Sequence, residues 1–245
     1  MIITINTPIL RDVLHIITQN SLTVNLEKTE TALTVSSTST NELSHVSVVF
    51  RRPFFEKWDR AKGFFEVDAK TLHDLSNTIH KESAVKIVMY KSRICFEITD
   101  KIFKKITLSD LKTCSTLKSI KKQGTDKRLA LKSETFLNIM GELGDVLDEA
   151  QLSLRKGHNQ IFFSGRKMGL TVEMSPEYAG DFSFEDDICL EFPIKFFQRF
   201  LPLLGNFEEV VLRLGTKETM IIEASNDKWR LALIVPKIEK NRNLP

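Results

Sequence analysis

The sequence predicts an α+β protein built from two copies of one domain fold, with antiparallel sheets and few helices. Most of the 245 residues fall into short segments rich in β-branched and aromatic residues, in which apolar and polar positions alternate as they do in strands. Only four segments place apolar residues at helical spacing. The order of helices and strands in the first half of the chain recurs in the second half, which indicates a duplicated fold.

Each of the four predicted helices has a start or stop signal. Thr7 is a candidate N-cap with Pro8 at the first helical position, and Asp68 is a candidate N-cap for the second helix. The fourth helix ends at Gly205, and Pro202 predicts that it ends or bends early. The helices are predicted over residues 7–19, 68–81, 133–147 and 192–205.

The remaining periodic segments predict strands, and the helices should cover one side of the sheets that these strands form. The expected strands are residues 22–28, 32–38, 45–50, 64–68, 84–91, 93–99, 102–109, 150–156, 159–165, 168–175, 187–192, 208–215, 219–225 and 229–236.

The repeat sets the expected domain boundaries. Pro8 and Glu134 begin matching helices, and so do Ala69 and Pro193, so the two copies are offset by about 125 residues. The segment between the copies is polar and basic, contains Gly124 and has no sustained periodicity, which is typical of a linker. We therefore expect a first domain over 1–110, a connector over 111–127 and a second domain over 128–245.

Catalytic and metal-binding motifs are missing from the sequence, which indicates a binding or scaffold protein, no enzyme and no cofactor. His73 and His80 are two helical turns apart but have no third ligand nearby in sequence, and solvated side chains are the favoured interpretation. The three widely separated cysteines are expected to be free thiols in a reducing compartment. No segment is typical of a signal peptide or a membrane span.

Basic and uncharged polar residues line the faces of three helices opposite their apolar stripes. Such a surface suits phosphate groups without reading bases, although ordinary solvated faces are the alternative. The third helix departs from this pattern, because its polar side carries Glu134, Glu142 and Asp145. The candidate DNA-binding residues are Arg11, His15, Lys70, His73, Asn77, Lys81, Lys195 and Arg199.

Three segments together resemble a known family. Residues 44–75 run from a Ser-His-Val-Ser strand through a Phe-containing turn into the second helix, residues 133–146 match a third helix, and residues 234–239 read Ile-Val-Pro-Lys-Ile-Glu. In this order and spacing, the chain resembles proliferating cell nuclear antigen (PCNA), the DNA sliding clamp of eukaryotic and archaeal replication. Its net charge of +3 and its basic connector differ from the usual acidic character of that family.

The resemblance implies a trimeric ring, homomeric or heteromeric, with antiparallel sheets outside and four helices on the inner face around double-stranded DNA. It implies DNA polymerase, clamp loader and other proteins with clamp-binding peptides as partners, and no membrane. Localisation would be nuclear in a eukaryote and cytoplasmic in an archaeon. The alternative is a clamp-fold scaffold, or a checkpoint or paralogue subunit of a mixed ring, with little affinity of its own for DNA.

The resemblance also implies two protein-binding sites. The partner-peptide pocket would comprise His45, Val46, Val48, Leu117, Ile120, Ile234, Val235 and Pro236. The interface between subunits would comprise Lys101, Lys104, Lys105, Glu173 and Glu177, with basic residues on one strand facing acidic residues on another.

Overall fold

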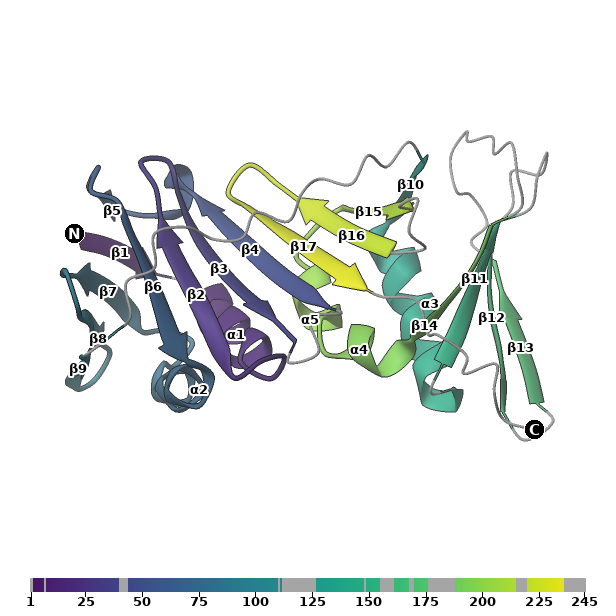
Figure 1. Cartoon of the computed structure of the whole chain (residues 1–245), viewed down its shortest axis with the longest axis horizontal. Helices are drawn as coiled ribbons and strands as arrows, with labels where there is room; N and C mark the ends of the chain where they lie inside the picture. Colours follow the sequence, from purple (N-terminus) through teal and green to yellow (C-terminus); the bar gives the residue numbers. More distant parts are fainter. Residues whose placement is uncertain are drawn as a thin grey trace. The chain divides into compact units, whose positions relative to one another are not determined.

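The computed structural model of the chain describes most of its residues (Figure 1). Contacts between residues divide the chain into two compact units. The first contains Met1–Lys121 with Ser225–Ala232, and the second contains Lys122–Ala224 with Leu233–Pro245. The described residues are 2–6, 8–39, 44–109, 111, 127–147, 149–154, 161–167, 170–175, 188–214 and 220–235.

The first unit contains two antiparallel groups of strands. One has the order β5 (Lys57–Trp58), β1 (Ile2–Asn6), β7 (Ala84–Met89), β8 (Ile94–Thr99) and β9 (Phe103–Leu108). The other has the order β6 (Gly63–Asp68), β2 (Thr23–Lys28), β3 (Ala32–Thr38) and β4 (His45–Arg51), with residues 229–232 of β17 (Trp229–Val235) beside β4. The helical elements are α1 (Pro8–Ile17), the short 3₁₀ helix η1 (Arg52–Phe54) and α2 (Ala69–Thr78).

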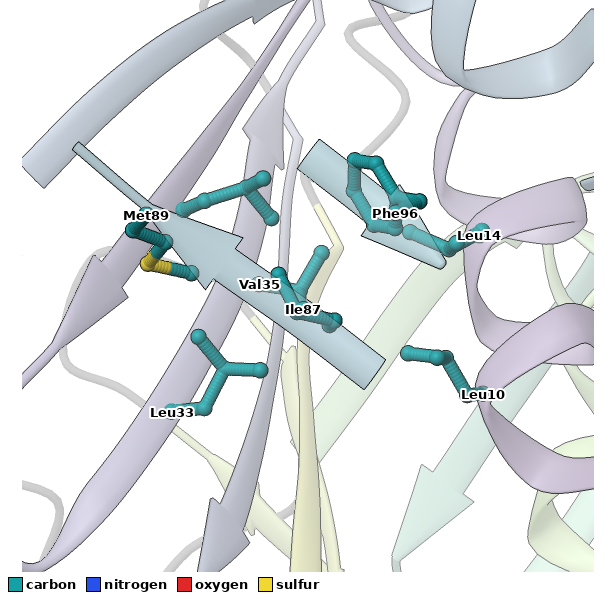
Figure 2. A pocket seen from close by; sticks show the side chains of 8 residues that line it. Leu10, Leu14, Leu33, Val35, Ile87, Met89 and Phe96 are labelled. Atoms are coloured by element: carbon teal, nitrogen blue, oxygen red, sulfur yellow. The ribbon is translucent and has the colours of Figure 1, made fainter. Parts of the chain in front are cut away.

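The core of the first unit lies between α1 and the two sheets, because the strands contribute apolar side chains at alternate positions and α1 contributes them at helical spacing. Leu10 and Leu14 of α1 meet Val35 of β3 and Ile87 and Phe96 of β7 and β8 around a void of about 10 Å³ (Figure 2). A void of this size holds about one water molecule at most. This cavity is therefore a small packing defect in a closed core and offers no room for a ligand.

The second unit repeats this plan. One sheet has the order β13 (Leu170–Met174), β12 (Ile161–Lys167), β11 (Glu149–Leu154) and β14 (Ile188–Pro193). The strands β10 (Lys127–Lys132), β15 (Glu209–Leu214) and β16 (Met220–Ser225) are also neighbours in that order. The helices are α3 (Ser133–Val146), α4 (Ile194–Gln198) and α5 (Leu201–Leu204).

The duplication extends to individual turns. Asp100, between β8 and β9, accepts a hydrogen bond from the Ile102 N–H at 2.8 Å, and Asn226, between β16 and β17, accepts one from the Lys228 N–H at 2.9 Å. The strands β6-β2-β3-β4 match β14-β11-β12-β13 in order, and β1-β7-β8 match β10-β15-β16. The predicted α+β fold with repeated antiparallel sheets and few helices is confirmed.

Two helix ends bear on the predicted site. The helix expected to bend near Pro202 is interrupted at Arg199 and Phe200, and Pro202 lies in the first turn of α5, as its missing N–H and fixed φ favour. The second helix ends at Thr78, earlier than predicted, because Ile79 is extended. Thr7, the expected cap of α1, lies outside the described residues.

Three strands of the structure were not predicted: β1, β5 and β10. β1 and β10 occupy equivalent places immediately before the first helix of each unit, where the sequence patterns of strand and helix run together. β5 has only two residues, Lys57 and Trp58, which pair with Thr4 and Ile3 of β1. A strand of this length has no periodicity that a sequence could display.

Candidate nucleic-acid interface

The two helices of the first unit meet through polar residues that the sequence singled out. The imidazole rings of His15 on α1 and His73 on α2 have centroids 4.6 Å apart. Thr18 joins them, since its hydroxyl donates to the His15 carbonyl at 2.9 Å and lies 3.3 Å from His73 Nδ1. Both histidines are partly buried. The structure thus brings two predicted site residues together, and it assigns them a helix–helix contact.

The exposed side of α2 carries Lys70 and Asn77, as predicted. The helix begins at Asp68, whose carboxylate accepts hydrogen bonds from the Thr71 N–H and from the Thr71 hydroxyl, both at 2.8 Å. These hydrogen bonds, that of the backbone N–H first, lower the pKa of Asp68. The cap was predicted from the sequence and is confirmed.

Two other predicted residues of the first unit differ from expectation. Lys81 is exposed, but it lies in the turn after α2, so its assignment to the row of polar residues on that helix was wrong. Arg11 is only partly exposed and pairs with Asp12 at 2.9 Å, so its charge is largely offset by its neighbour. The cation most fully presented by these helices is therefore Lys70.

In the second unit, α4 rests on the last turn of α3. A Cβ atom at Gly144 of α3 would collide with the side-chain amide of Gln198, so a larger residue at this position would displace that side chain. Gln198 and Gly144 occupy the places in the repeat that His73 and Thr18 occupy in the first unit. Lys195 and Arg199, on either side of Gln198, are exposed as predicted.

The repeat relates the exposed lysines of the two units. Lys70 is the second residue of α2 and Lys195 is the second residue of α4, and α4 begins 125 residues after α2, at Ile194 and Ala69 respectively. Both lysines are exposed. Each unit therefore presents a cation at the same place in the fold.

The exposed side of α3 has the opposite charge. Glu134, Glu142 and Asp145 are exposed, and Asn138 lies between them. None of the described residues within α3 is basic. The acidic polar side that the sequence predicted for the third helix is therefore present on the surface. The candidate phosphate-binding cations of the second unit are Lys195 of α4 and Arg199, the residue after it.

The predicted subunit interface falls on two strands that lie at the edges of their sheets. Among the described strands, β9 has only β8 as a neighbour and β13 has only β12. Lys101 and Lys105 are exposed and Lys104 is partly exposed. Glu173 of β13 is exposed, and Glu177 lies outside the described residues.

One of the two lysines of β9, Lys105, is already paired within the chain. Glu97 of β8 binds Lys86 at 2.6 Å and Lys105 at 3.4 Å. The hydrogen bond from Lys86 is the main reason that the pKa of Glu97 is lowered. Lys105 is therefore a partner of Glu97 before it meets any other chain.

Sequence reasoning missed the apolar residues of this edge. Ile102 is 67% exposed and Phe103 is 60% exposed, at the beginning of β9. Large apolar side chains exposed next to each other on an edge strand mark an interaction surface. Ile102 lies in the turn before β9, where polar residues are usual, and Phe103 is the first residue of that strand.

The residues of the predicted peptide pocket are mostly buried or undescribed. Val46, Val48 and Val235 have no exposed surface, so these side chains fill the core. His45 and Ile234 are partly exposed. Leu117, Ile120 and Pro236 lie outside the described residues, and the connector with them, so the pocket stays a prediction.

The described part of the chain contains no group of three or more metal-ligating side chains. Within the same residues, no helix is long and apolar enough to span a membrane.

Comparison with known proteins finds similar folds among solved structures. No family model and no curated protein sequence matches the chain. Among solved structures, a PCNA2–PCNA3 complex from Sulfolobus tokodaii matches with a TM-score of 0.80 and 10% identity, covering 97% of this chain and 99% of the other. The proliferating cellular nuclear antigen of Entamoeba histolytica matches with a TM-score of 0.78 and 13% identity, covering 97% and 98%. The chain therefore has the clamp fold of PCNA over nearly its whole length.

Proposed function

We propose that the chain is a DNA sliding clamp, a ring-forming protein without enzymatic activity that encircles duplex DNA and tethers replication and repair proteins to it. The observation that carries this proposal is the duplicated clamp fold with Lys70 and Lys195 exposed at equivalent places in its two units. Cations repeated in this way contact phosphates without reading the bases, which is what a protein that slides requires.

Ring closure is supported by the internal repeat. In the first unit, the Arg51 N–H at the end of β4 donates to the Lys228 carbonyl at 2.8 Å, and Phe50 stacks on Trp229 of β17. The counterparts of β4 and β17 in the repeat are β13 and β9, each of which lies at the edge of its sheet. Phe103 begins β9 as Trp229 begins β17. We infer that β9 of one copy pairs with β13 of the next, and that three copies close a trimer, in which no such edge is left open.

Partner proteins would dock as short peptides, and a DNA polymerase and a clamp loader are the clients that this function requires. Of the proposed pocket, His45 and Ile234 are the described residues with exposed surface. The basic connector, through Lys118, Lys121 and Lys122, would favour peptides with acidic flanks.

A second candidate function is a subunit of a mixed ring that binds proteins and has little affinity of its own for DNA. The acidic exposed side of α3 favours it, since Glu134, Glu142 and Asp145 repel phosphates. The similar structure from Sulfolobus tokodaii is a complex of two different proteins, PCNA2 and PCNA3.

The test is stimulation of a cognate DNA polymerase on primed circular DNA by the purified chain. A sliding clamp increases the length of product synthesised in one binding event. No increase with any cognate polymerase, alone or with added clamp subunits, contradicts the proposal. An increase only in the presence of other subunits supports the mixed ring.

A further inference from the structure

Three turns of the first unit meet at one end of its sheet. The Arg52 N–H, at the start of η1, donates to the Thr31 carbonyl in the β2–β3 turn at 2.8 Å. Trp58 Nε1 donates to the Glu30 carbonyl of the same turn at 2.8 Å. Arg51 bonds the β16–β17 turn twice, through its N–H to the Lys228 carbonyl and through its guanidinium to the Asn226 carbonyl, both at 2.8 Å.

These turns expose six cations, which we call the basic turn patch: Arg51, Arg52, Lys57, Arg60, Lys62 and Lys228. The exposed carboxylates of the same turns are Glu30, Glu56 and Asp227, which leaves a net charge of +3. This equals the net charge of the whole chain. Within the described residues, Lys62 is the member of the patch that pairs with a carboxylate, that of Glu30 at 2.9 Å.

A buried lysine fixes the backbone of this patch. The Lys28 side chain is fully buried, and its ammonium donates to the carbonyls of Asp59 and Ala61, both at 2.6 Å. It also pairs with the Asp59 carboxylate at 3.1 Å and lies 4.2 Å from the centre of the Trp58 ring. Lys28 therefore neutralises the inner carboxylate of the loop and holds the segment that presents Lys57 and Arg60.

The two arginines at the start of η1 are also held in place, and their partners are backbone carbonyls, which carry no net charge. Arg51 and Arg52 each bond a backbone carbonyl, of Asn226 and Phe55 respectively, through one guanidinium nitrogen. A guanidinium has five N–H donors in a fixed fork, so most of them remain to bind an oxyanion. Binding groups that are already ordered lose little entropy when a ligand arrives.

The basic turn patch is separate from the candidate interface on the helices. Strands β2 and β6 pair from Lys28 and Gly63 at one end to Thr23 and Asp68 at the other. The patch adjoins the first end, and α2 begins at the second. Six paired residues span about 17 Å, and Figure 1 shows the turns and α2 at opposite ends of these strands.

The chemistry of the patch favours phosphates over a peptide. Binding sites for proteins usually contain an exposed aromatic or aliphatic anchor. Phe54 and Trp58 are only partly exposed, and Trp58 packs against Phe55 at 4.5 Å. The large apolar side chains that are exposed in the described part of the chain are Leu22, Tyr90, Ile102 and Phe103, none of which belongs to the patch.

We propose that the basic turn patch is a second nucleic-acid contact, which binds the phosphates of a DNA strand independently of sequence and apart from the helices. It rests on the proposed function only in taking DNA as the ligand, since the patch belongs to one unit and does not require a ring. Each of its cations replaces counterions on the DNA, so its contribution is largest at low salt.

The test is the salt dependence of binding to labelled duplex and single-stranded oligonucleotides, followed by fluorescence anisotropy. The variant K57A/R60A removes two exposed cations that form no side-chain bond among the described residues. The control for total charge is K91A/R128A, which removes one lysine and one arginine exposed elsewhere, of which Arg128 pairs with Glu209 at 4.0 Å. Thermal unfolding checks that both variants are folded.

We expect K57A/R60A to bind more weakly and to reduce the log–log salt slope by about 0.9 for each phosphate that is no longer neutralised on duplex, or about 0.7 on single strands. The control should keep the parent slope. The two oligonucleotides show which form of DNA the patch prefers. A parent-like slope for K57A/R60A on both overturns the proposal.

Two comparisons separate this proposal from the proposed function. If K70A/K195A weakens DNA binding and K57A/R60A does not, the second contact is wrong and the helical interface stands. If neither variant changes DNA binding, the helical interface and the second contact are both wrong. If K57A/R60A loses affinity for a labelled polyglutamate peptide but keeps its affinity for DNA, the patch faces proteins and the inference is overturned.

Discussion

The rings of His15 and His73 are inclined by 34° with their centroids 4.6 Å apart, so the two helices of the first unit meet through paired histidines. Thr18 also contacts His73, and the counterpart of that contact in the second unit joins Gly144 to Gln198. Different residues thus form the contact between helices at the same place in the two copies of the fold. The contact in the second unit involves Gly144, so substitution of this glycine tests it directly.

Two glycines of α3 should respond differently to alanine. Gly141→Ala meets no atom within 4 Å, so it should raise the free energy of unfolding by about 0.5–1 kcal/mol through helix propensity. Gly144→Ala forces the end of the flexible Gln198 side chain to move, so it should stabilise the protein less than Gly141→Ala does. Urea unfolding measures both changes.

The double variant G144A/Q198A isolates the cause. Removing the displaced side chain should restore most of the gain that Gly141→Ala shows. If G144A alone is as stabilising as G141A, the close approach of α4 to α3 is wrong.

The helical interface predicts a specific weakening of DNA binding. Removing the repeated cations in K70A/K195A should lower the log–log salt slope by about 0.9 for each phosphate that is no longer neutralised. The fold should be unaffected, because both side chains are exposed. Anisotropy titrations at several salt concentrations measure the slope, with K91A/R128A as the control for total charge. A slope equal to that of the parent places the DNA elsewhere.

The edge of β9 predicts the state of assembly. Ile102→Glu with Phe103→Glu should dissociate the ring, because each buried side chain of this size contributes about 1.5–3 kcal/mol, so the dissociation constant should rise by on the order of a hundredfold or more. Leu22→Glu is the matched control, since Leu22 is 72% exposed and precedes β2 rather than belonging to β9. Light scattering at micromolar concentration gives the mass of each variant.

A parent that is itself a monomer in this measurement means that the chain needs other subunits to close a ring. A double variant with the same mass as an oligomeric parent shows that β9 is not the interface.

His45 predicts a pH dependence of stability. Burial lowers the pKa of His45 below its ordinary value of 6.5, and Thr38 lies 3.0 Å from its Nδ1. Below pH 6.5 the unfolded chain therefore binds a proton that the folded chain resists, so the free energy of unfolding falls as the pH drops from 6.5 toward the lower folded value. Above 6.5 this contribution is fully present. His45→Gln should flatten the dependence, as measured by urea unfolding between pH 5 and 8. An unchanged dependence assigns it to another group.

Much of the fold could be predicted because its patterns are local. Pro8 and Asp68 begin helices where steric and hydrogen-bonding rules favour them, and the interruption before Pro202 follows from its missing N–H. The duplication was visible because the two copies keep the same order of periodic segments. The two-residue strand β5 was missed because its pairing with β1 depends on tertiary contact alone.

The candidate site was predicted less well because the sequence alone does not show which side chains are exposed or which charged groups are paired. The spacing of Arg11 places it among the basic residues on the polar face of its helix, but in the structure its guanidinium pairs with the carboxylate of Asp12. Val46 and Val48 alternate as a pocket wall or a core would, and the structure buries them. Five of the six cations of the basic turn patch lie within residues 51–62, but the patch was missed because Lys228 and the turn that Arg51 binds come from far along the chain, as in the bond from Arg51 to Asn226.

Topological linkage to DNA tests the central proposal most directly. A linear duplex with biotin at both ends is incubated with the protein at low salt, streptavidin is then added, and the DNA is washed at high salt, which removes proteins held only by phosphate contacts. A ring that has threaded over the free ends should stay on the blocked DNA and leave the unblocked DNA. Equal release of the protein from blocked and unblocked DNA would contradict a sliding clamp.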